Sequence, residues 1–244
     1  APPRSLSRKN IIVFLASFLL MIIHIKQTCA KYALSFKHQH SATPMFKKQD
    51  NSAPKTQETS TIKNSEPFGI RIGISSCLLG NKVRFDGGHK RDRYITETLG
   101  QFFEFVPVCP EVECGLPVPR EAMRLKGDRE APRLIGVKTG TDFTSQMNQW
   151  AAARVRELED QDLCGFIFKS KSPSSGMERV KIYNKDNIPH PTGVGLFAKI
   201  FKDHFPLLPT EEEGRLHDIG LRENFIESVF VYLRWRSACQ EPTP

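Results

Sequence analysis

The sequence predicts an α/β fold: a compact three-layer domain with a small, mostly parallel sheet, preceded by a disordered N-terminal extension. Two observations support this prediction. Short β-branched runs alternate along the chain with longer segments of helical periodicity, which is the pattern of strands joined by crossover helices. The chain has 244 residues, of which 39% are hydrophobic, and this is enough to form one core of ordinary size.

The first two predicted strands each run directly into a cysteine. Ile70–Ser76 has the β-branched character of a buried strand and is followed by Cys77. A helix is expected at Arg93–Phe103, and a second strand at Glu104–Val108 runs into Cys109. In an open α/β sheet, ligands bind beyond the carboxyl ends of the strands, so both cysteines are predicted to lie at that edge.

The later elements complete the predicted layers. A helix at Ser145–Asp160 places four apolar residues on one face, and either Asp142 or Thr144 is expected to cap it. The apolar residues are Met147, Ala151, Val155 and Leu158. The other predicted elements are strands at Leu134–Lys138, Cys164–Lys169 and Val180–Tyr183, and helices at Val194–Asp203 and Leu221–Trp235.

The first 66 residues are predicted to be a disordered or spurious extension. The apolar run Ile11–Ile25 resembles a signal-peptide core or a short anchor, but it is short for a membrane span. Residues 26–66 are polar and have no hydrophobic periodicity. Because Met45 opens a natural-looking start, we expect residues 1–44 to be absent from the physiological protein, which would then have no membrane segment.

The positive charge is concentrated in this extension. Residues 1–68 hold 10 Lys/Arg against 3 Asp/Glu, a balance of +7, whereas residues 69–244 hold 25 against 24, a balance of +1. The predicted domain therefore has no basic excess with which to neutralise phosphates, and we expect no nucleic-acid partner.

The six cysteines show neither a CxxC pair nor a zinc-finger spacing, which argues against a structural zinc site or a secreted disulfide scaffold. Cys164 lies in the apolar stretch "LCGFIF" and is expected to be a core residue.

Three loops concentrate reactive side chains. Residues 77–92, "CLLGNKVRFDGGHKRD", combine a soft metal ligand with flexible glycines and many charges. Residues 107–120 hold Cys109 and Glu111 among four prolines, which fix the backbone and would place a thiolate beside a proton donor. Residues 169–176, "KSKSPSSG", offer serine hydroxyls, although such loops often satisfy only their own backbone.

Together and in this order, these segments resemble the thiouracil desulfurase family, formerly a domain of unknown function. The matching stretches are "SSCLLGNKVRFDGGHKRD", "VPVCPEV" with "GLPVPR", "SPSSGMERVKIY" and "EEGRLHDIGLRENFIESVF", which together span nearly all of residues 69–237. The resemblance implies a compact α/β domain at residues 67–237. It also implies that residues 238–244 begin a linker to a second, helical domain.

The resemblance further implies a 4Fe-4S cluster. Cys77 and Cys109 match two of its three protein ligands, Glu111 matches an acid proposed for proton transfer, and Ser172 matches a serine near the substrate. The third ligand is expected in a "SPSCG" pattern, where this chain has Ser175. Either Ser175 ligates iron as an alkoxide, which is uncommon, or Cys114 replaces it from the neighbouring loop.

Two further readings of the third ligand stay open. Cys164 is less convenient, since it lies about 16 Å back along its strand at about 3.3 Å per residue. Alternatively, the site has lost its cluster.

The resulting prediction is a cytoplasmic enzyme that removes sulfur from a thiolated small molecule, such as a thiouracil-like base or nucleoside. Soft iron binds thiocarbonyl sulfur in preference to oxygen and acts as a Lewis acid, after which water replaces the sulfur. An electron donor would serve only to keep the cluster reduced. The alternative is a non-catalytic module in which a cluster or metal ion has a structural or redox-sensing role.

Overall fold

The computed structural model describes residues 69–240, and most of them form one compact unit. The predictions for residues 1–66, including the apolar run Ile11–Ile25 and the start at Met45, lie outside the described residues. Within the described part of the chain, no helix has the length and apolar character needed to cross a membrane.

A four-stranded parallel sheet forms the centre of the unit, in the order β2-β1-β5-β8. Its strands are β1 (Arg71–Ser75), β2 (Glu104–Val108), β5 (Leu163–Phe168) and β8 (Thr210–Glu212). All six residues of β5 are buried, as expected of a strand covered on both faces. The chain moves from β1 to β2 on one side and later returns to β5 on the other, so the strand order reverses at β1.

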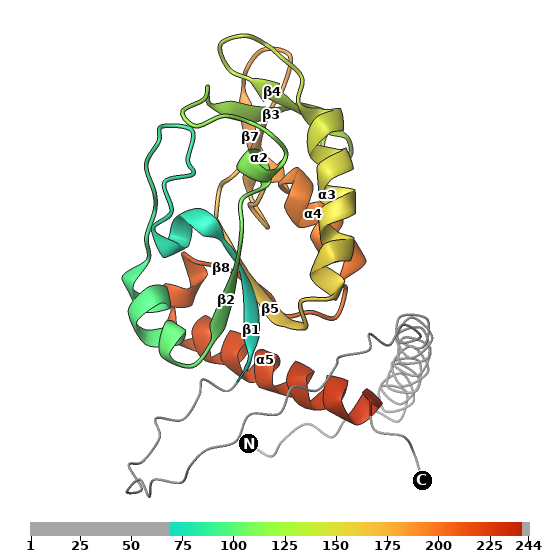
Figure 1. The fold of residues 1–244 in the computed structure, drawn as a ribbon. Helices are drawn as coiled ribbons and strands as arrows, with labels where there is room; N and C mark the ends of the chain where they lie inside the picture. The colour runs from blue at the N-terminus through green and yellow to red at the C-terminus, as the bar shows by residue number, and fades with distance from the viewer. Residues whose placement is uncertain (1–68, 241–244) are drawn as a thin grey trace, which may run out of the picture. The chain divides into compact units, whose positions relative to one another are not determined.

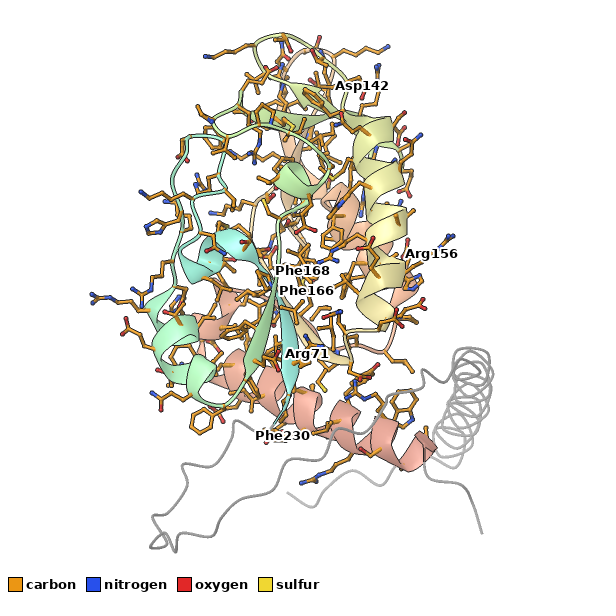
Figure 2. The ribbon with its side chains drawn as sticks, in the orientation of Figure 1. Arg71, Asp142, Arg156, Phe166, Phe168 and Phe230 are labelled. Carbon is orange, nitrogen blue, oxygen red and sulfur yellow. The ribbon has the colours of Figure 1, made fainter. Side chains whose placement is uncertain are left out.

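Helices cover both faces of this sheet (Figure 1). Helices α3 (Thr144–Glu159) and α4 (Leu196–His204) pack on one face through a cluster that includes Phe166 and Phe168. These two rings lie in the middle of the unit (Figure 2) and stack with centroids 4.2 Å apart. Helix α5 (Ile219–Gln240) covers the other face with Phe225 and Val229. The predicted three-layer α/β architecture is confirmed.

A second, mixed sheet lies beyond the carboxyl end of β2, next to the short helix α2 (Pro110–Glu113; Figure 1). Its strand order is β4-β3-β6-β7, with only the β3–β6 pair parallel. The strands are β3 (Met123–Gly127), β4 (Pro132–Gly136), β6 (Val180–Tyr183) and β7 (Pro189–Gly193). The sequence did not predict this sheet, because β3 is half polar and β7 reads "PHPTG", a composition tolerated only at a sheet edge.

Three predicted elements differ from the structure in type or in where they end, and the others form within two residues of their expected bounds. The helix predicted at Arg93–Phe103 is instead a π-helical turn at Tyr94–Thr98 followed by a 3-10 turn at Leu99–Gln101. The Thr96 hydroxyl donates to the Asp92 carbonyl at 2.9 Å, a side-chain bond that competes with regular α-helix.

The other two differences concern element ends. The strand predicted at Leu134–Lys138 ends at Gly136, because the Lys138 N–H donates to the Glu121 carboxylate in a turn. Helix α5 continues to Gln240, beyond its predicted end at Trp235 and into the predicted linker.

Candidate active site

Three loops meet at the carboxyl edge of the parallel sheet because they follow its three adjacent strands β2, β1 and β5. Cys77 lies in a 3-10 turn after β1, and Cys109 lies between β2 and α2. We call residues 169–176, which follow β5, the serine loop. The strand order reverses at β1, and such a switch point is where open α/β sheets bind ligands.

These loops enclose a cavity of about 380 Å³, within the usual size range of small-molecule sites. Its lining includes the predicted residues Cys77, Cys109, Glu111, Ser172 and Ser175. The structure therefore brings together five of the six candidate residues.

Cys77 and Cys109 are buried thiols whose backbones are firmly held. The Cys77 carbonyl accepts the Lys90 N–H at 2.9 Å, and the Cys109 N–H donates to the Glu113 carboxylate at 2.7 Å. Burial raises the pKa of Cys77 to about 11, and the Glu111 charge contributes to the shift. Burial and the same carboxylate raise the pKa of Cys109 to about 12. Both groups are thiols at neutral pH, so binding a metal would release their protons.

Glu111 is the acidic group of the cavity, and hydroxyl groups orient its carboxylate. The buried Ser174 hydroxyl donates to Glu111 Oε1 at 2.5 Å, and the Ser172 hydroxyl reaches the same oxygen at 3.5 Å. The Cys109 thiol faces Oε2 at 3.6 Å. Glu111 thus lies between a thiol and a pair of serine hydroxyls, where a proton could be exchanged with a bound molecule.

Ser174 is a site residue that the sequence analysis missed. Its only signal was its place in "SPSSG", where any of three serines could face the cavity or its own backbone. The structure shows that Ser174 Oγ is 3.0 Å from Ser172 Oγ and 3.4 Å from Ser175 Oγ, so the three hydroxyls form one group.

The amino end of α4 supports this group from behind. The N–H of Leu196 donates to the Pro173 carbonyl at 3.2 Å, and the N–H of Ala198 donates to the Ser174 carbonyl at 3.1 Å. The first N–H groups of a helix need partners outside it, and here the serine loop supplies them.

Cys114 is the candidate that the structure places elsewhere. It does not line the cavity but packs against the hydrophobic cluster beside Met123 and Trp150, and its thiol donates to the Glu111 carbonyl at 3.2 Å. Ser175, which is almost fully buried, does line the cavity. Cys164 lies in the core against α5, as expected from its apolar surroundings.

Several charged and aromatic lining residues were also missed. The Arg120 guanidinium lies 3.9 Å from Glu111 and is almost fully buried, and Lys169 pairs with Glu213. The ring of Phe85 lines the cavity while remaining 40% exposed. The stretch "GLPVPR" contained Arg120, but a lone arginine after prolines carries no local signal for a site.

Two side chains of the cavity, Cys77 and Cys109, carry donor atoms that suit an iron–sulfur cluster. Among the described residues, no group of three His, Cys, Asp or Glu side chains is arranged to hold a metal ion. The cavity instead presents two thiols, from Cys77 and Cys109, and the hydroxyl of Ser175. Thiolates are the usual ligands of iron–sulfur clusters, and a serine oxygen is an uncommon one.

The fold and the site define a class of protein: a three-layer α/β domain with a pocket at the carboxyl edge of its parallel sheet that contains two thiols and one acid. The chain belongs to the 2-thiouracil desulfurase family, whose sequence model matches residues 72–213. This confirms the resemblance seen in the sequence. The search of curated proteins finds no match.

Among solved structures, the chain is similar to the 4Fe-4S-dependent thiouracil desulfidase TudS. The two share 25% sequence identity with a TM-score of 0.51, over 64% of this chain and 98% of that one.

Proposed function

We propose that the domain removes sulfur from a thiolated small molecule of the thiouracil kind at a 4Fe-4S cluster held by Cys77 and Cys109. One observation carries the proposal: two buried thiols from adjacent strand ends line the same cavity as a carboxylate held by serine hydroxyls. Family membership and the likeness to TudS support it.

We assign the third ligand position to Ser175 rather than to Cys114. Ser175 lines the cavity with the two thiols, whereas Cys114 packs outside it. An oxygen ligand is weaker for iron than a thiolate, so this cluster is expected to bind less tightly than one held by three cysteines.

When bound, the cluster supplies a soft Lewis acid for the sulfur of a thiocarbonyl group. The net reaction is a hydrolysis, in which C=S and water give C=O and hydrogen sulfide, so turnover consumes no electrons. In this proposal Glu111 takes a proton from the water. The Ser172 hydroxyl, 3.5 Å from Glu111 Oε1, orients the Glu111 carboxylate. An electron donor would serve only to keep the cluster in its working oxidation state.

The exposed ring of Phe85 is suited to bind a planar heterocycle. It lines the cavity, and the Arg84 guanidinium lies over it with its carbon 5.4 Å from the ring centroid. Stacking on an aromatic side chain contributes about 1–3 kcal/mol per base in single-stranded nucleic-acid complexes. A thiouracil-like ring would gain a similar contact here.

A non-catalytic role is the second candidate, and the serine at position 175 favours it. A cluster with one oxygen ligand could be lost or could serve a redox-sensing purpose. For either role we propose a reducing, cytoplasmic environment, since the site depends on free thiols at Cys77 and Cys109.

The two functions differ in whether sulfide release depends on substrate. We would reconstitute the full chain anaerobically, add 2-thiouracil and measure hydrogen sulfide together with uracil. The desulfurase function predicts equal amounts of both, and loss of at least about 100-fold in Glu111→Gln, the range typical of a general acid–base. A loaded protein that releases no sulfide above its cluster content would favour the non-catalytic role.

A further inference from the structure

Three consecutive glutamates, Glu211 to Glu213, lie in and directly after the end of strand β8, and all three carboxylates are largely buried. Burying a carboxylate is costly unless the charge is paired or accepts strong hydrogen bonds. Each of the three has such partners, and the partners of two of them lie on or directly after the serine loop.

Glu213 holds the beginning of the serine loop. Its carboxylate accepts the Ser170 N–H at 2.6 Å and the Ser170 hydroxyl at 2.8 Å, and it pairs with the Lys169 ammonium group. The backbone of Glu213 is itself fixed, because its N–H donates to the Phe168 carbonyl at 3.1 Å. The first two loop residues are therefore tied to the sheet.

Glu212 holds the chain where the loop ends. Its Oε1 accepts the N–H of Met177 at 2.8 Å and that of Glu178 at 3.4 Å. Bonds from N–H groups to a buried carboxylate are stronger than those to a neutral acceptor. The two glutamates thus fix both ends of the loop and leave only residues 171–176 between them.

The part of the loop between these two ends, whose backbone also accepts hydrogen bonds from the amino end of α4, contains the hydroxyls that orient Glu111. Ser172 and Ser174 both reach its Oε1, at 3.5 Å and 2.5 Å. A displacement of either end of the loop would move these hydroxyls and so change the position of the carboxylate. Neither Glu212 nor Glu213 lines the cavity, so both contact the site through the serine loop; the Glu213 charge in addition helps to raise the pKa of Cys77.

We propose that Glu212 and Glu213 are positioning residues, which clamp the serine loop in the geometry that orients Glu111. The inference rests on the proposed desulfurase function. Glu211 provides a matched control from the same strand: it is equally buried, but the partners of its Oε1 are the Arg215 guanidinium at 2.7 Å and the Glu212 N–H at 2.8 Å.

The test compares Glu212→Gln, Glu213→Gln and Glu211→Gln in the full chain. Two quantities are measured: kcat and KM for sulfide release by the loaded protein, and the rate of amide hydrogen exchange in residues 171–176. In the first two variants we expect kcat to fall about 10- to 100-fold, the cost of misplacing a catalytic group by about 1 Å, with a smaller change in KM. Loop exchange should accelerate in the same two variants and remain near wild type in Glu211→Gln.

The proposal is overturned if the first two variants match Glu211→Gln in kcat, or if loop exchange is unchanged. If the wild type releases no sulfide, the proposed function fails, and the exchange rates alone still decide whether the clamp exists. Should Glu213→Gln not fold, Ser170→Ala removes one of the same bonds from the loop side and is judged by the same two measurements.

Discussion

Ser175 is the residue on which the strength of the proposed cluster site depends. Its hydroxyl lines the cavity with the thiols of Cys77 and Cys109, in a loop whose backbone is held by α4. The sequence left this position open between Ser175 and Cys114, because the distance between two loops is set by the sheet and cannot be obtained from their separation along the chain.

Ser175→Cys is therefore expected to increase cluster binding. A third thiolate replaces an oxygen ligand, so iron and acid-labile sulfide per chain should rise after anaerobic reconstitution at limiting iron. Cys114→Ala is the matched variant and should leave both contents unchanged, since Cys114 packs outside the cavity. A loss of cluster in Cys114→Ala would instead make Cys114 the third ligand.

The two thiols should also make the stability of the cluster-free protein depend on pH. Their pKa values in the folded protein are about 11 for Cys77 and about 12 for Cys109, above the ordinary value of 9.0. The folded state keeps protons that the unfolded chain loses, so the free energy of unfolding should fall as pH rises above 9.

By pH 10 this fall amounts to about 2 kcal/mol for the pair. Urea denaturation at pH 8, 9 and 10 measures it. The double variant Cys77→Ala/Cys109→Ala should lose less stability over that interval than the wild type. Equal losses in the two proteins would show that the thiols are not buried as described.

Phe85 is expected to contribute to substrate binding rather than to the chemical step. Phe85→Ala should raise KM about 5- to 160-fold, corresponding to a lost stacking contact of about 1–3 kcal/mol, with kcat little changed. Phe102, which is 55% exposed and does not line the cavity, provides the control, and Phe102→Ala should behave as wild type. A Phe85→Leu variant with normal KM would mean that the site needs apolar bulk but no aromatic ring.

At the scale of single elements, the close approach of α4 to the serine loop depends on Gly195. A Cβ atom at this position would lie 2.5 Å from the backbone carbonyl of Ser174, too close for any side chain. The helix can donate its first N–H groups to the loop only because that side chain is absent.

Gly195→Ala should consequently destabilise the protein by about 1–3 kcal/mol, as overpacking of a fixed backbone usually does. Gly214→Ala is the control. A Cβ atom at Gly214 would lie 4.0 Å from its nearest neighbour, Ser170 Oγ, and the backbone of Gly214 is right-handed helical. Thermal melts of the two variants measure the difference. A Gly195→Ala protein that melts with the wild type would mean that the loop and the helix are not held together.

The elements differ in how far the sequence predicts them. Buried strands such as β5 and amphipathic helices such as α3 were predicted correctly, because hydrophobic burial imposes a periodic pattern. Strand β7 was missed, since an edge strand is defined by its neighbour and tolerates prolines. Strand β8, "TEE", was missed because it has only three residues and is polar, and the partner of its Glu212 carboxylate, Met177, lies far away in sequence.

At the scale of the whole molecule, the site is built within one part of the chain. Its lining runs from Ser75 to Ser175, and helices α2, α3 and α4 end within the predicted domain at residues 67–237, whereas α5 continues to Gln240. The sequence was sufficient to predict that Cys77 and Cys109 lie in one site, because the residues that follow neighbouring parallel strands lie at the same edge of the sheet. The contacts of Glu212 and Glu213 with the serine loop, and the position of Arg120 beside Glu111, could not be predicted. They depend on the packing of segments that are distant in sequence, which leaves no local pattern.

A fragment comprising residues 67–237 is expected to fold and to bind the cluster as the full chain does. Its three core clusters and the cavity use residues of this range. Circular dichroism melts and iron content of the fragment and the full chain provide the comparison. If the fragment does not fold, or folds without binding the cluster, part of the domain must lie outside residues 67–237.

The central claim is that Cys77 and Cys109 together hold an iron–sulfur cluster. Iron and acid-labile sulfide content after anaerobic reconstitution tests it most directly, in the full-length wild type, Cys77→Ala, Cys109→Ala and the control Cys164→Ala, whose thiol lies in the core. We predict a cluster in the wild type and in Cys164→Ala, and its loss in each of the other two variants. Equal iron and sulfide contents in all four proteins, or none in the wild type, would contradict the account.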